Sequence, residues 1–271
     1  MNMNKQLELE NDGKKWDWEE TLIAFDLYSR IQYSTISGKN SEVIKLALLL
    51  KRKPGAVAKK LFNIAAHDPK QQSRGIVGLS HSSKLDKMIW DEFETNSFKV
   101  SVDAKEALAR ISGTGIDRII DIETEPLIAE MFPYGEEREI ATTARIGQYF
   151  FRGAVLSAYH KKCCVTGISE EKLLIASHIK PWRVSDTKTE RTNPRNGLCL
   201  NALHDKAFDQ GLITLNDKYE VVMSERLLRT DMDAETKNWF MSYSGKRIEL
   251  PDKFMPDIEF IHYHNDEVFL H

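Results

Sequence analysis

The stretch LLIASHIKPWRVSDTKTERTNPRNGLCLNALHDKAFDQG, residues 173–211, joins an apolar run, a polar loop and a short amphipathic segment. His178 lies at the end of the apolar run, Asn196 follows the polar loop, and His204 lies inside the amphipathic segment. Two histidines and an asparagine in this order are the side chains that a small metal-dependent hydrolytic site needs. The stretch therefore decides how this half of the chain is interpreted.

Secondary-structure signals give the stretch a framework. A short strand is predicted over 163–166 and a second over 173–179, which must stop before Pro181 because proline cannot donate to a sheet ladder. Apolar residues at helical spacing predict a helix over 198–210, with Gly211 just beyond its end. The expected unit is strand–strand–helix, with a strand end and a helix facing one cleft.

Phosphodiester hydrolysis suits the three side chains. It needs a base to activate water and a cation to neutralise charge on the phosphate and the leaving oxygen. A neutral histidine, with an ordinary pKa of about 6.5, can be the base, and histidine or carboxylate can hold the metal. His178 and His204 can face the same cleft, and Asn196 can bond backbone across the loop or hold the catalytic imidazole.

Composition narrows the classes of protein. The 271 residues, 41% hydrophobic and 29% charged, indicate a soluble globular chain of one large or two modest domains. No apolar run reaches the roughly 18 residues of a membrane span, and the polar N-terminus lacks a secretory core, so a cytoplasmic protein is expected. The three cysteines fit a reducing compartment. A net charge of −3 leaves nucleic-acid binding to local basic patches.

The chain before the quoted stretch is predicted to be mainly helical, and a smaller set of elements follows it. Helices are predicted over 16–32, 42–50 with Ser41 as N-cap, 55–66, 87–94, 103–111 and 137–161. The turn Arg52-Lys53-Pro54 makes the second and third of these resemble a helix-turn-helix. A hairpin is predicted over 212–223, a helix over 234–242, and a strand that holds His262 and His264.

The expected fold class is α+β, with an N-terminal mainly helical, helix-turn-helix-like domain ahead of a ββα-metal domain. The predicted parts are a flexible tail over 1–15, a helical DNA-recognition or regulatory domain over 16–112, a linker over 113–136, and the ββα domain with a C-terminal extension over 137–271.

A cluster of cations marks the helix-turn-helix-like segment. Between residues 51 and 60 the chain has Lys51, Arg52, Lys53, Lys59 and Lys60 and no acidic residue. One interpretation is a patch that contacts phosphate, through Arg52, Lys59 and Lys60 in particular. The other is the solvated face of a small helical bundle, and the pattern alone favours neither.

Several blocks, in order, resemble the HNH endonuclease family, in the branch found in bacterial restriction enzymes. The matching blocks are RIGQYFFR (145–152), CCVTG (163–167), ASHIKPW (176–182), NPRNGLCL (193–200) and LHDKAFDQGLI (203–213). LPDKFMP (250–256) and FIHYHNDEVF (260–269) resemble the C-terminal extension of that branch, and EETLIAFDLYSR (19–30) and KLFNIAAHDP (60–69) resemble a helical domain fused ahead of such nucleases. Five ordered blocks are a far more specific signal than three isolated residues.

The resemblance implies roles for the three central residues. It makes His178 the general base, Asn196 the residue that orders the loop and active site, and His204 a ligand of a divalent cation, Mg²⁺ or Mn²⁺. Many relatives carry an acid or histidine as a second ligand just before the base, where this chain has Ser177, so Asp205 is a candidate helper.

The cysteines depart from the zinc-binding members of the family. Cys163 and Cys199 occupy only parts of the two CxxC pairs that hold structural zinc in those members, and the chain has three cysteines in all. A four-Cys zinc site is therefore excluded, and buried thiols are expected.

These features predict a metal-dependent DNA endonuclease, of the restriction or anti-phage kind, acting on double-stranded DNA. Since one such site cuts one strand, double-strand cleavage predicts a homodimer. The cations that flank the site suit phosphate contacts or plain solvation: Lys180, Arg183, Arg195 and Lys206. Two alternatives stay open, a non-cleaving DNA-binding regulator and a nuclease gated by a small ligand of its N-terminal domain.

Overall fold

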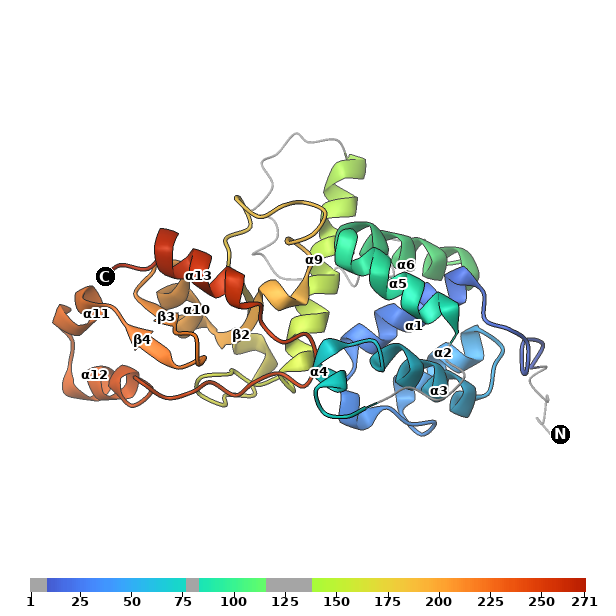
Figure 1. The fold of residues 1–271 in the computed structure, drawn as a ribbon, viewed down its shortest axis with the longest axis horizontal. Coiled ribbons are helices and arrows are strands. Elements are labelled where there is room, and N and C mark those ends of the chain that lie inside the picture. The colour runs from blue at the N-terminus through green and yellow to red at the C-terminus, as the bar shows by residue number, and fades with distance from the viewer. Residues whose placement is uncertain (1–8, 77–82, 116–137) are drawn as a thin grey trace. The chain divides into compact units, whose positions relative to one another are not determined.

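The computed structural model describes residues 9–76, 83–115 and 138–271, with side chains from residue 143 onward in the last range. The chain divides into two compact units, Met1–Phe150 and Phe151–His271. The first is helical and the second mixes helices with two small antiparallel sheets, which confirms the α+β fold class (Figure 1). The predicted linker lies outside the described residues except at 113–115. None of the described helices is long and apolar enough to cross a membrane.

The first unit is built around one central helix. Its elements are α1 (Trp18–Arg30), α2 (Ser41–Leu49), α3 (Pro54–Ala65), α4 (Pro69–Gln72), α5 (Lys84–Thr95), α6 (Ser97–Ser112) and the first part of α9 (Arg138–Ala158). α1 contacts α2 and α3 as well as α5 and α6, so it is covered on several faces (Figure 1). Every residue from Glu20 to Ser29 is therefore buried.

The helix starts in this unit follow capping chemistry. Asp17 and Glu20 form a capping box at the start of α1, each bonding the other's backbone N–H. α2 begins one residue earlier than predicted, because the Asn40 side chain, not that of Ser41, accepts from the Glu42 and Val43 N–H groups. Pro54 occupies the first turn of α3, where its missing N–H costs nothing.

Two cations of this unit are buried and form ion pairs with buried carboxylates. The Arg52 guanidinium is 3% exposed and bonds both oxygens of Glu20, at 2.9 and 2.7 Å. Its Nη1 donates to the backbone carbonyls of Asn11 and Lys14, and its Nη2 also donates to that of Lys15, so residues 11–15 of the predicted tail are tied to the helices. Lys60, also 3% exposed, bonds Asp86 at 2.6 Å.

The second unit holds the strand–strand–helix arrangement. β1 (Leu174–His178) pairs antiparallel with β2 (Gly197–Asn201), and α10 (Ala202–Asp209) follows directly and contacts both strands. A second hairpin, β3 (Ile213–Leu215) and β4 (Val221–Met223), comes next, and the remaining helices are α11 (Glu225–Arg229), α12 (Ala234–Met241) and α13 (Ile258–Glu267). Figure 1 shows this unit in yellow to red.

Three predicted elements of this unit are wrong. Residues 163–166 form a turn, so β1 pairs with 197–201, the start of the predicted helix 198–210. All five residues of β2 are buried, and a fully buried short strand has no alternation that separates it from a helix in sequence. His262 and His264 lie in α13, not in a strand.

Two glycines allow close packing around this unit. A Cβ at Gly197, which pairs with His178, would lie 2.4 Å from a methyl carbon of Val155. Gly211 has a φ of +67° just beyond α10, as predicted, and a Cβ there would lie 2.0 Å from the Val268 carbonyl oxygen. The helix end is thus pressed against the chain that follows α13.

Candidate active site

His178, the last residue of β1, sits among aromatic rings and a backbone carbonyl. Its ring stacks on Phe151 with the centroids 3.9 Å apart and meets the edge of Trp182 at 5.4 Å. Its Nε2 lies 2.9 Å from the carbonyl oxygen of Arg191, in the loop between β1 and β2. These contacts leave the ring little freedom to rotate.

The carbonyl decides which nitrogen carries the proton. A carbonyl oxygen can only accept, so Nε2 donates to Arg191 and Nδ1 of the neutral ring keeps its lone pair. Burial lowers the pKa of His178 to about 4, helped by the Arg191 charge and opposed by the Arg191 carbonyl. At neutral pH the ring is therefore an unprotonated base with one free acceptor nitrogen.

Asn196 orders the loop that carries this carbonyl. It is fully buried, and its Oδ1 accepts from the Lys180 N–H at 2.8 Å. Its amide nitrogen faces the Lys180 carbonyl, the Ser185 hydroxyl and the Glu190 carbonyl at 3.1–3.4 Å. One side chain thus fixes both ends of the loop after His178, which is the loop-ordering position predicted for it.

The structure places the His204 ring in an aromatic cluster. Its side chain is fully buried against Trp239, Phe240 and Tyr243, with ring centroids 4.7, 5.5 and 5.6 Å away, whereas His178 contacts other rings. Nδ1 faces the Asn201 amide nitrogen at 3.1 Å, and burial lowers the pKa of His204 to about 4. Its Nε2 is buried and has no hydrogen-bond partner among the described residues, so the metal-ligand role of His204 stays a prediction.

Asn201 ties this histidine to the turn before β1. Its amide nitrogen also approaches the Cys163 sulfur at 3.4 Å and the Thr166 hydroxyl at 3.1 Å, while its Oδ1 caps α10. Cys163 is a buried free thiol, as are the other two cysteines, Cys164 and Cys199, which confirms the expectation of buried thiols. This polar cluster holds the start of α10 in place.

α10 also carries two acidic residues. Asp205 and Asp209 lie four residues apart on one helix face, where side chains are neighbours. Desolvation raises the pKa of Asp205, and desolvation with the Asp205 charge raises that of Asp209 to about 6. Ser177, next to the base, lies close enough to Asp205 to lower its pKa.

These groups suit a divalent cation that keeps open positions. Among the described residues neither carboxylate has an ion-pair partner, and the hydroxyl of the buried Ser177 has no neighbouring polar group besides the Asp205 carboxylate. Carboxylate and hydroxyl oxygens are ligands that Mg²⁺ accepts together with water. No group of three or more His, Cys, Asp or Glu side chains that could hold a metal occurs in the described part of the chain.

The flanking cations predicted to touch DNA differ in availability. Lys180 pairs with Glu190 at 2.7 Å and lies over the Tyr263 ring, and Arg195 is half-buried. Arg183 and Lys206 are exposed. Arg191, which the sequence interpretation passed over, contacts His178 through its backbone carbonyl. Nothing local in its sequence marks it, because its position depends on how the loop folds back.

In the first unit, burial changes the interpretation of the basic cluster between residues 51 and 60. Arg52 and Lys60 are buried and paired with Glu20 and Asp86, so they cannot reach phosphate. A cation already paired inside a core leaves it only at a cost of several kcal/mol. Lys59 is exposed and stays available. The helix-turn-helix-like segment therefore presents far less positive charge than its sequence indicates.

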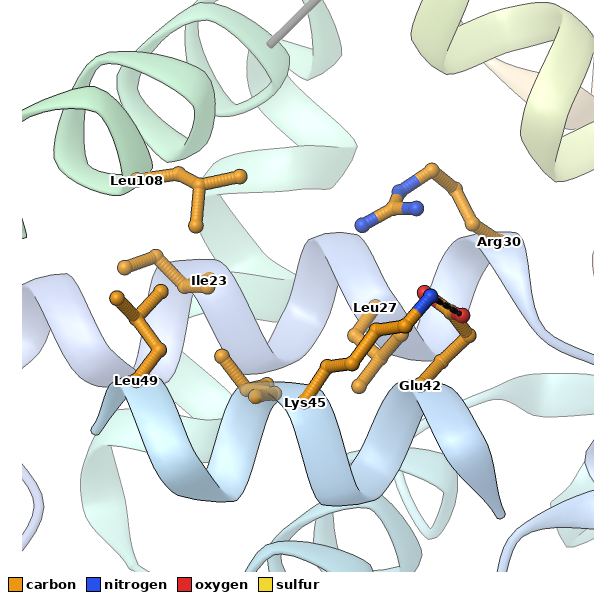
Figure 2. A pocket seen from close by; sticks show the side chains of 8 residues that line it. Ile23, Leu27, Arg30, Glu42, Lys45, Leu49 and Leu108 are labelled. Carbon is orange, nitrogen blue, oxygen red and sulfur yellow. Dashed lines mark hydrogen bonds and ion pairs between the residues drawn. The ribbon is translucent and has the colours of Figure 1, made fainter. Parts of the chain in front are cut away.

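The first unit also contains a small pocket of about 190 Å³. Its lining is Ile23, Leu27, Arg30, Glu42, Lys45, Leu46, Leu49 and Leu108. Figure 2 shows an apolar floor and a charged rim on which Lys45 pairs with Glu42. The volume is below the roughly 300–1,000 Å³ of typical ligand sites, so the pocket gives little support to a ligand-gated enzyme.

A strand–strand–helix unit with a histidine base at the strand end and carboxylates on the helix defines a ββα-metal nuclease domain. Residues 163–216, which contain β1, β2, α10 and β3, match the family model described as HNH endonuclease. This segment is an HNH endonuclease domain, in agreement with the resemblance seen in the sequence, and the family hydrolyses phosphodiester bonds.

Similarity beyond this segment is limited. A solved structure entitled "Modification dependent TagI restriction endonuclease" is 19% identical over 44% of this chain, with a TM-score of 0.27. The match covers 37% of that enzyme, so most of its length has no counterpart here. No curated protein matches the chain.

Proposed function

We propose that the protein is a metal-dependent endonuclease that cleaves double-stranded DNA, as a restriction or anti-phage enzyme of the cytoplasm. The observation that carries the proposal is His178: a half-buried, unprotonated imidazole whose Nε2 is held by the Arg191 carbonyl, within an HNH domain. A base fixed in this tautomer is of little use to a protein that only binds DNA.

His178 performs the proton transfer. Its Nδ1 takes a proton from a water molecule, the water oxygen bonds to phosphorus, and the bond from phosphorus to the 3′-oxygen breaks. Stacking on Phe151 and the bond to the Arg191 carbonyl hold Nδ1 in one direction during this transfer. Loop order comes from Asn196, which acts through the backbone and not on the substrate.

Asp205 and Asp209, with water, would hold the divalent cation, Mg²⁺ or Mn²⁺, in place of His204. When bound, the cation supplies positive charge to the phosphate and to the leaving oxygen. The support is the paired carboxylates on one face of α10, beside a buried Ser177 hydroxyl that has no neighbouring polar group among the described residues besides the Asp205 carboxylate. The histidine ligand expected from sequence, His204, stays the alternative to this assignment.

Phosphate contacts in the nuclease unit are assigned to the exposed cations. Arg183 and Lys206 are accessible, and Lys59 is the accessible cation of the first unit's predicted set. Because one site cuts one strand, linear products would require two copies of the chain acting together. A homodimer on DNA is therefore part of the proposal.

The deciding experiment is DNA cleavage by purified protein with Mg²⁺ or Mn²⁺, on plasmids of different methylation. Wild type should nick or linearise plasmid, and His178→Ala should lose at least about 100-fold of the rate, the lower range for a general base. His262→Ala, an exposed histidine that bonds Asp217, is the matched control and should cleave like wild type. DNA binding with no metal-stimulated cleavage on any substrate would instead indicate a non-cleaving regulator.

A further inference from the structure

Arg191 contacts the environment of the base in two ways. Its backbone carbonyl accepts from His178 Nε2 at 2.9 Å. Its guanidinium lies over the Trp182 ring at 5.3 Å, and the same ring meets His178 at 5.4 Å. Arg191 thus places its backbone carbonyl on His178 and its positive charge on Trp182, the ring that contacts His178.

The guanidinium is braced and only partly used. Its Nε donates to the Ser185 carbonyl at 3.0 Å, which fixes the plane of the group. Its two terminal nitrogens make no hydrogen bond or ion pair with any described residue. The residue is half-buried, so part of it is open to solvent.

Other cations of this region are less well placed. Lys180 is neutralised by Glu190, and Lys206 lies next to the carboxylates of α10. Arg183 is exposed, and no hydrogen bond or ion pair to a described residue holds its charge in one direction. Among these described cations, Arg191 combines a guanidinium held by a hydrogen bond with donors that no described residue uses.

We propose that Arg191 is a catalytic residue whose terminal nitrogens bind a non-bridging oxygen of the scissile phosphate. The proposal rests on the proposed nuclease function and adds the group that receives the phosphate. Arginine suits this contact because its planar donors match two phosphate oxygens, and its charge offsets the charge that builds as water attacks. A phosphate held there lies beside the base that activates the water.

The test compares three variants on one short duplex that carries a cleavage site first mapped on plasmid. Arg191→Gln should lower kcat by about 100- to 1,000-fold, the usual loss for one fixed charge donor, with a smaller change in KM. Arg191→Lys should recover part of the rate. Arg229→Gln, which changes an exposed arginine of α11 outside the proposed site, is the matched control and should stay within a few-fold of wild type. Thermal melting checks that each variant folds.

A sulfur-substituted duplex separates phosphate contact from loop support. With one non-bridging oxygen of the scissile phosphate replaced by sulfur, wild type should slow for one stereoisomer more than for the other. Arg191→Gln should lose that difference, since the group that senses the atom is gone. An Arg191→Gln enzyme with the wild-type rate, or one that is slow but keeps the full stereoisomer difference, overturns the proposal. Absence of cleavage by wild type would instead overturn the nuclease function itself.

Discussion

Two histidines of one motif have different roles because of their neighbours. The neighbours of His178 leave one ring nitrogen free: a carbonyl takes its Nε2, and Phe151 covers one face. His204 is enclosed by three aromatic side chains and approached by Asn201 at Nδ1. The residue type is the same, but the two rings have different partners, and the proposed base is the first of them.

The tautomer and pKa of His178 can be measured directly. Nitrogen-detected NMR of the metal-free protein should show the Nε2–H form and a titration well below the ordinary value of about 6.5, near the 4 expected from burial. The unfolded protein in denaturant provides the reference titration. A ring that titrates near 6.5, or that carries its proton on Nδ1, would contradict the assignment of Nδ1 of His178 as the proton acceptor.

Substitutions on α10 separate its metal ligands from its structural residues. Asp205→Asn should weaken Mn²⁺ binding, measured by calorimetry or electron paramagnetic resonance, by at least tenfold while the melting temperature changes little. His204→Ala should behave in the opposite way, with an unfolding free energy lower by about 2–4 kcal/mol because a buried aromatic cluster loses a member. Loss of Mn²⁺ affinity in His204→Ala but not in Asp205→Asn would restore the histidine ligand.

At the scale of elements, two connections decide where the chemistry lies. The loop between β1 and β2 is folded back by Asn196, and this brings Arg191 to the base. α10 is fixed at its start by Asn201 and at its end by Gly211, against the chain after α13. The active-site geometry thus depends on contacts made well outside the three motif residues.

The α2–α3 segment gives a prediction of its own. Arg52→Ala should lower the unfolding free energy by about 3–5 kcal/mol, because Glu20 would be left buried without its partner. Lys59→Ala, a neighbouring exposed cation, should change stability by no more than about 0.5 kcal/mol. Urea denaturation measures both. Equal stability of the two variants would show that Arg52 is not a buried partner of Glu20, and would favour the predicted role of Arg52 in contacting phosphate.

At the scale of the whole molecule, each compact unit carries its own buried polar groups. The helical unit holds ion pairs such as Lys105 with Asp26 at 2.8 Å. The nuclease unit holds buried neutral histidines, among them His264, which stacks on Phe208 and donates to its carbonyl. The two units should therefore respond differently to acid.

His264 makes the nuclease unit sensitive to low pH. Burial lowers its pKa to about 4, below the roughly 6.5 of the unfolded chain, so the unfolded state binds the extra proton first. The stabilisation of the folded state by neutral His264 is complete above about pH 6.5 and is lost as pH falls towards 4. Between pH 7.5 and 4.5 wild type should lose about 2–3 kcal/mol more unfolding free energy than His264→Gln. Since other titrating groups are shared, equal losses in the two proteins would contradict this account.

Much of the nuclease half was predictable because its signals are local. The apolar run before Pro181, the polar loop and the glycine after α10 predicted a strand–strand–helix unit, and the structure has one. The identity of the second strand was wrong, because residues 197–201 are buried on every side and their pattern also fits a helix. Burial on both faces removes the alternation that identifies a strand.

Sequence alone determined the class of domain, the fold class and the placement of His178 and Asn196 around one loop. Only the tertiary structure decided that His204 lies among aromatic residues, that the Arg191 carbonyl contacts His178, and that Arg52 pairs with Glu20 inside the helical unit. The reason is physical: spacing along the chain sets which face a residue takes, whereas its charge, solvent access and free hydrogen bonds depend on partners far away in sequence. His204 meets Trp239 and Arg52 meets Glu20 only after the chain has folded.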